Sequence, residues 1–190
     1  MDLKPEHYIM PYRYPVSAED YFEWRPFWRL AKGKGVEVGV LEGQNAEEAL
    51  KWNPEIKELT LIDPWLMFKD IIGELDVFDQ AAFDNIYLRV KNKFINNPIV
   101  KIIRKPSVEA AKDFKDESLD FVYLDDDHTE KAVRAGLSAW MPKLKQGGLM
   151  GGHDSYESSV QGALVNFFKE EYPGYFETKL NSWWFYKNAD

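Results

Sequence analysis

The sequence predicts an α/β fold, a Rossmann-like doubly wound sheet of seven strands that is mostly parallel with an antiparallel last strand. Short apolar runs alternate with longer amphipathic segments along the chain. Parallel strands joined through helices form right-handed crossovers, which produce a doubly wound sheet. The tail 175–188 holds two strand-like runs without helical spacing between them, as expected of an antiparallel pair at the sheet edge.

The elements follow from local patterns in chain order. Amphipathic spacing predicts a helix over 17–31, with Pro26 as an internal interruption because proline lacks a backbone N–H. Short apolar runs predict strands at 35–40, 58–63, 99–104, 119–125 and 149–154. Helices are expected at 44–52, 79–95, 107–114, 129–144 and 158–172.

Length, charge and composition limit the possible classes of protein. The 190 residues suit one domain, with an N-terminal helical extension at 1–33 and a Rossmann-like core at 34–190. The absence of cysteine excludes disulfides and thiolate metal sites. The net charge of −8 repels phosphate backbones, so we expect no nucleic-acid partner. Neither a signal-peptide pattern nor a long apolar run is present, so we expect a cytoplasmic protein without a membrane partner.

Polar residues gather where the expected strands end. Ligands of doubly wound sheets bind beyond the carboxyl ends of the strands, so these residues are candidates for a site. They are Glu37 and Gly39 on the first strand, Asp63 on the second, Asp125 on the fourth, and His153 and Asp154 on the fifth.

A glycine-containing turn and a carboxylate indicate a nucleoside-type ligand. Gly39 and Gly43 lie between a strand and a helix, where glycine allows close approach of a ligand. Asp63, about 20 residues further on, is placed to accept hydrogen bonds from ribose hydroxyls. Neither a dinucleotide fingerprint nor a phosphate-binding loop is present, so the ligand expected is an adenosine without a pyrophosphate. The alternative interpretation is that the glycines belong to an ordinary turn that binds no ligand.

The run "DDDHTEK" at 125–131 places carboxylates directly after an apolar strand, where unpaired charge is costly. Asp125, His153 and Asp154 could bind a hard divalent ion such as Mg²⁺ or Mn²⁺. Such an ion would also relieve repulsion among the acids.

The next residues of this run have both functional and ordinary interpretations. The unperturbed pKa of His128 suits a base near neutrality, and its alternative is a packing or hydrogen-bonding role. Asp126 is expected to be solvated, and the ordinary interpretation of Asp126 and Asp127 is that they cap a helix beginning near Thr129.

Five runs together resemble the class I S-adenosylmethionine-dependent methyltransferases. From about residue 34 onward they are "GVEVGVLEG", "LTLIDPW", "KPSVEAAKDF", "LDFVYLDDDH" and "LKQGGLMGGHDS". The run "SWWFYK" fits the antiparallel seventh strand of that fold. One departure is Leu41, which replaces the second glycine of the family's G-x-G.

The resemblance implies S-adenosyl-L-methionine as the cofactor. It implies that Glu37 and Gly39 hold the amino-acid end of the cofactor, and that Gly43 allows close packing at the turn. Asp63 would bind the ribose hydroxyls, and Ser107 would lie beside the adenine.

The last two runs resemble the divalent-metal-dependent O-methyltransferases, such as the catechol, caffeoyl-CoA and macrolide-sugar enzymes. This implies that Asp125 serves the cofactor site and, with His153 and Asp154, holds a metal. His128 would be the catalytic base. His153 departs from those families, which have a carboxylate there.

The function expected is O-methylation of a small-molecule or sugar hydroxyl, which makes such an acceptor the expected partner. The sequence carries no signal for oligomeric state. Two alternatives are a metal-dependent hydrolase that uses the same acids and histidines, and a protein that binds the cofactor without catalysis.

Overall fold

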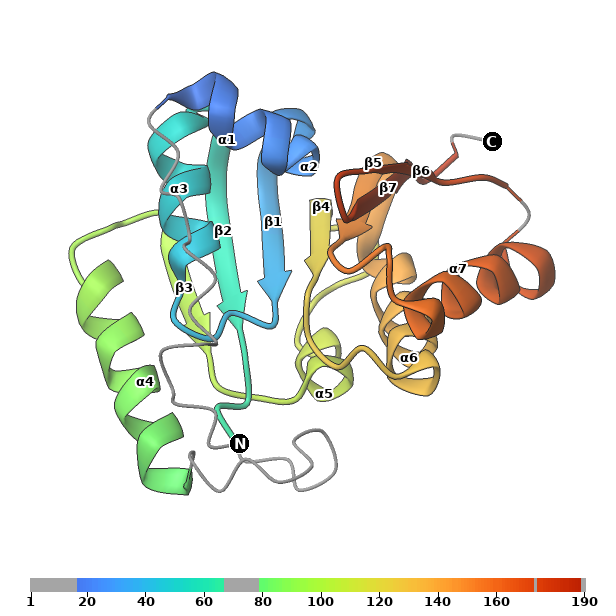
Figure 1. Ribbon diagram of the computed structural model, residues 1–190. Coiled ribbons are helices and arrows are strands. Elements are labelled where there is room, and N and C mark those ends of the chain that lie inside the picture. The colour runs from blue at the N-terminus through green and yellow to red at the C-terminus, as the bar shows by residue number, and fades with distance from the viewer. Residues whose placement is uncertain (1–16, 67–78, 173, 189–190) are drawn as a thin grey trace, which may run out of the picture.

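A computed structural model describes residues 17–66, 79–172 and 174–188. The described residues form a seven-stranded sheet with the order β3-β2-β1-β4-β5-β7-β6 (Figure 1). Strands β1 to β5 are parallel, and β7 is antiparallel to both of its neighbours. The predicted fold class is therefore confirmed. The strands are β1 Gly33–Val38, β2 Ile56–Ile62, β3 Val100–Ile103, β4 Leu119–Leu124, β5 Leu144–Gly152, β6 Glu177–Lys179 and β7 Ser182–Tyr186.

The helices flank this sheet. They are α1 Ala18–Trp24, α2 Pro26–Leu30, α3 Gln44–Trp52, α4 Gln80–Phe94, α5 Ser107–Ala111, α6 Glu130–Trp140 and α7 Ser158–Glu170, with a 3₁₀ helix at Met141–Lys143. Among the helices of the described residues, none is both long and apolar enough to cross a membrane.

The single helix expected at 17–31 is wrong, because the chain forms two short helices there. Pro26 is the first residue of α2, where its missing N–H costs no helical bond. Arg25 lies between the helices in a non-helical conformation, with φ −133° and ψ 65°. This break divides the expected helix into α1 and α2.

Among the other element boundaries, the start of β5 and the end of α6 differ most from those expected. β5 begins at Leu144 rather than at 149, because Leu144 pairs with Leu119 of β4 before an irregular stretch through Gly147. α6 ends at Trp140 rather than at 144, since Pro142 cannot continue the hydrogen-bonding pattern of an α-helix.

Two hydrophobic cores cover the two faces of the sheet. One includes Val36, Val122 and Trp140, and packs the sheet against α5, α6 and α7. The other includes Trp28 and packs the opposite face against α1 to α4. Successive residues of a strand point to opposite faces, so Glu37 lies on the α1–α4 side, where it contacts α3.

Candidate functional site

Backbone hydrogen bonds continue the sheet one residue beyond the ends of its central strands. The N–H groups of Gly39, Asp125 and His153 donate to carbonyls at the ends of the neighbouring strands, at 2.9, 2.8 and 3.2 Å. These bonds hold the first residues after β1, β4 and β5 side by side. The strand order reverses between β1 and β4, which is where ligands bind in doubly wound sheets.

The turn after β1 lies tightly against the turn after β4. Gly39 has φ +84°, and a Cβ there would lie 1.9 Å from the carbonyl oxygen of Asp125. Only glycine fits this position. Gly43 has φ +69° at the N-cap of α3, where a Cβ would lie 3.0 Å from the ring of Phe94. Both glycines therefore allow close packing, and Gly39 brings the β1 turn against β4.

Asp63 holds two loops together. Its Oδ2 accepts hydrogen bonds from the N–H groups of Val40 and Leu41, both at 2.9 Å, and its Oδ1 accepts one from Trp65 N–H at 2.6 Å. The buried Trp65 indole donates in turn to the carbonyl of Leu41 at 2.9 Å. A carboxylate offers about four acceptor positions, so about one remains for a ribose hydroxyl. Ribose binding by Asp63 stays a prediction.

Glu37 is almost fully buried at the end of β1, with 1% of its surface exposed. Burial raises its pKa to about 8, although a hydrogen bond from Asn45 opposes this shift. Asn45 donates to Oε1 at 2.9 Å and also accepts a hydrogen bond from the Tyr21 hydroxyl. Glu37 Oε2 has no partner among the described residues. The site thus contains a buried carboxyl oxygen that a ligand could satisfy.

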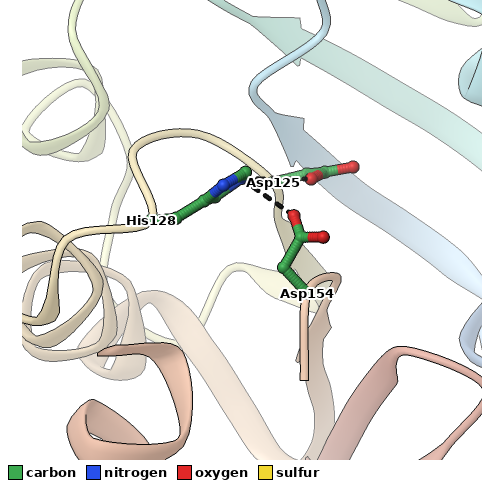
Figure 2. Close-up of side chains that lie close together, drawn as sticks. All are labelled: Asp125, His128 and Asp154. Carbon is green, nitrogen blue, oxygen red and sulfur yellow. Dashed lines mark ion pairs between the residues drawn. The ribbon is translucent and has the colours of Figure 1, made fainter. Parts of the chain in front are cut away.

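Asp125, His128 and Asp154 form a charged cluster at the ends of β4 and β5 (Figure 2). His128 Nε2 lies 2.9 Å from Asp154 Oδ2 and 3.9 Å from Asp125 Oδ1. One ligand atom from each of the three residues lies within 4.8 Å of the others, a spacing that could hold a metal ion. A small pocket beside them is lined in part by Asp125 and His128.

The cluster shifts the protonation of its own members. The carboxylates of Asp125 and Asp154 raise the pKa of His128 to about 10. Burial acts to raise the pKa of Asp154, but hydrogen bonds from His128 and His153 outweigh it and hold that pKa well below its usual range. In this arrangement His128 carries a proton at neutral pH and is not ready to accept another.

His153 lies beside this cluster and is engaged on both ring nitrogens. Arg25 Nη1 lies 2.8 Å from His153 Nε2. A guanidinium can only donate, so Nε2 accepts and the ring proton is assigned to Nδ1. That nitrogen lies 3.1 Å from Asp154 Oδ1. The expected metal ligands Asp125, His153 and Asp154 stay a prediction, and the residues spaced to hold an ion together are Asp125, His128 and Asp154.

The loop after β4 differs from expectation at Asp126. This residue is partly buried, and burial raises its pKa to about 6 against a hydrogen bond with Ser107. The expectation of a solvated capping residue is wrong, since Thr129 caps α6 by accepting from Ala132 N–H. Ser107 also accepts a hydrogen bond from the Trp140 indole at 3.1 Å. Its place beside an adenine stays a prediction.

Sequence reasoning missed two residues of this region. Arg25 belongs to a break between helices and reaches His153 across 128 positions, so no local pattern indicated the contact. Tyr123 is an aromatic residue inside an apolar strand, which resembles any core residue. Its only signal was the hydroxyl, because buried tyrosines usually have a hydrogen-bond partner.

Comparison with known proteins identifies the class of the chain. The family model described as a methyltransferase domain matches residues 36–155, which is more than half of the sequence. No curated protein sequence matches the chain significantly.

Solved structures share the fold at low sequence identity. A candidate caffeoyl-CoA O-methyltransferase from Staphylococcus aureus is 14% identical, with a TM-score of 0.60 over 87% of this chain and 82% of that chain. A methyltransferase from Geobacter sulfurreducens is 13% identical, with a TM-score of 0.58 over 87% and 77%. Spermidine synthase from Thermotoga maritima is 16% identical, with a TM-score of 0.56 over 86% and 57%. These neighbours support the fold alone.

Proposed function

The chain belongs to the methyltransferase domain family, and we propose that it transfers a methyl group from S-adenosylmethionine to a hydroxyl of a small-molecule or sugar acceptor. One observation carries this proposal. The Gly39 turn, where a cofactor would lie, packs directly against the backbone of Asp125, the first member of the charged cluster. A methyl donor bound at the Gly39 turn would therefore lie next to the charged cluster, whose polar side chains can orient an acceptor.

The residues at the strand ends fit the cofactor. Glu37 offers a buried, unpartnered oxygen, and Gly39 leaves the backbone open to close approach. When bound, S-adenosylmethionine supplies a methyl group on a sulfonium, and the protein's part is to position the acceptor oxygen and receive its proton. The residues proposed to hold the cofactor are Glu37, Gly39, Gly43, Asp63, Ser107 and Asp125.

A divalent ion fits the second part of the site. Two carboxylates and an imidazole, from Asp125, Asp154 and His128, suit Mg²⁺ or Mn²⁺. Such an ion supplies a positive charge that lowers the pKa of a bound hydroxyl. His128 then has two possible roles, as a ligand of the ion or as the base once its pairing with Asp154 is broken.

Calorimetric titration with S-adenosylhomocysteine, with and without Mg²⁺, tests the proposal. We expect micromolar or tighter binding, followed by methyl transfer to hydroxyl acceptors in a radiolabel screen and loss of transfer in excess EDTA. Full activity in excess EDTA would exclude a role for the metal and leave the methyltransferase proposal standing. Phosphodiester hydrolysis without cofactor binding would favour a hydrolase, and binding without transfer to any acceptor would favour a non-catalytic protein.

A further inference from the structure

Two buried polar atoms at the reversal point of the sheet have no hydrogen-bond partner among the described residues. They are the hydroxyl of Tyr123 and Oε2 of Glu37, on side chains that are 0% and 1% exposed. The two residues pair in register across β4 and β1, so their side chains leave the same face of the sheet. An unpartnered buried polar group lowers stability and is rare in folded proteins. Two such atoms on paired residues of neighbouring strands make this place a candidate for binding a ligand.

Charged groups of the site surround both atoms. The charges of Asp125 and Arg25 act on Tyr123 as well as on Glu37, so all four residues lie in one polar region. The ring of Tyr123 packs between apolar neighbours, with the ring centroids of Phe27 and Trp28 both at 4.9 Å. Packing therefore fixes the ring and leaves the hydroxyl as its only polar contact point.

We infer that Tyr123 recognises the α-carboxylate of the cofactor while Glu37, which releases its proton to solvent on binding, accepts hydrogen bonds from the α-ammonium. This inference rests on the proposed function and goes further by assigning a specificity role to Tyr123. A zwitterionic amino-acid group needs a donor and an acceptor side by side. A phenol with an ordinary pKa of about 10 stays a donor at neutral pH, and Arg25 adds positive charge for the carboxylate. Protein atoms cover both groups. Cofactor binding must therefore displace part of the structure that covers them, and this part includes α2.

A comparison of two ligands tests this role. S-adenosylhomocysteine carries the amino-acid group, whereas 5′-methylthioadenosine shares the nucleoside and thioether but lacks that group. In Tyr123→Phe we expect the Kd for S-adenosylhomocysteine to rise about tenfold, the scale of one hydrogen bond to a charged group, with no change for 5′-methylthioadenosine. The melting temperature should stay equal or rise, because the substitution removes an unpartnered hydroxyl. Tyr186→Phe, at a half-exposed position on β7, is the matched control.

The possible results separate the inference from the proposed function. If Tyr123→Phe weakens both ligands equally, or weakens neither, the inference is overturned while cofactor binding stands. A lower melting temperature with unchanged S-adenosylhomocysteine affinity also overturns it, because the hydroxyl is then structural. Failure of the unmodified protein to bind either ligand overturns the inference and the proposed function together.

Discussion

The β1–β2 side and the β4–β5 side of the site both place an aspartate at the end of a strand, but they satisfy it in different ways. Asp63 accepts hydrogen bonds from three backbone N–H groups, whose positions the chain itself fixes. Asp154 is paired with the imidazoles of His128 and His153. Backbone partners cannot leave without reshaping the loop, whereas side-chain partners can be exchanged for an ion or a substrate. The first side is therefore a scaffold, and the second is free to change partners.

The largest effect is expected where the two sides meet. In Gly39→Ala the new Cβ collides with the backbone of the β4 turn, and the left-handed φ adds strain. We expect the free energy of unfolding, measured with urea, to fall by roughly 3–5 kcal/mol. Gly147→Ala is a matched control, because φ is similar at +73° but nothing lies within 4 Å of its Cβ. That variant should lose only about 1 kcal/mol, and equal losses would mean that the two sides are not in tight contact.

A pH-dependent effect is expected at Glu37, on the scaffold side. Burial raises the pKa of Glu37 from 4.5 to about 8, so the folded protein holds a proton that the unfolded chain releases. Stability is then fully present below pH 4.5 and falls as the pH rises towards 8. Glu37→Gln cannot ionise, so it should match the unmodified protein near pH 4.5 and exceed it by up to about 4 kcal/mol at pH 8.5. Urea unfolding at both pH values measures this, and a difference that does not change with pH would contradict it.

The smallest effect on stability is expected on the exchangeable side. The side chain of His128 is 49% exposed, so loss of its ion pair in His128→Ala should cost no more than about 1 kcal/mol. Removal of one proposed ligand should nevertheless weaken Mn²⁺ binding at least tenfold, as measured by calorimetry. Lys131→Ala, at an exposed position of α6, controls for loss of positive charge. A large loss of stability with unchanged Mn²⁺ affinity would assign His128 to the scaffold.

The sequence predicted those features of the fold and the site that local residue patterns determine. Alternating strands and helices fixed the order of elements, and strand ends identified Gly39, Asp63 and Asp125 as neighbours in space. Pro26 also indicated the start of a second helix, because proline is common at the first position of a helix.

The remainder of the site depends on tertiary contacts. Nothing local distinguishes an aspartate that accepts backbone bonds from one that pairs with imidazoles, so the different surroundings of Asp63 and Asp154 could not be foreseen. The burial of Asp126 depends on the fold around its loop, and the Arg25–His153 contact joins distant parts of the chain. Tyr123 could not be distinguished from a core aromatic because its missing partner is visible only in three dimensions.

The break at Pro26 has a consequence for how the protein is made. Because α2 precedes the whole sheet in the chain, a ribosome produces Phe27 and Trp28 long before their partners Phe121 and Tyr123. During synthesis these rings have no core to enter, and they stay exposed to solvent or chaperones until β4 and β7 emerge. The contact of Arg25 with His153 waits for the same late strands. The helix α2, which is translated before every strand of the sheet, is thus among the last elements to reach its place.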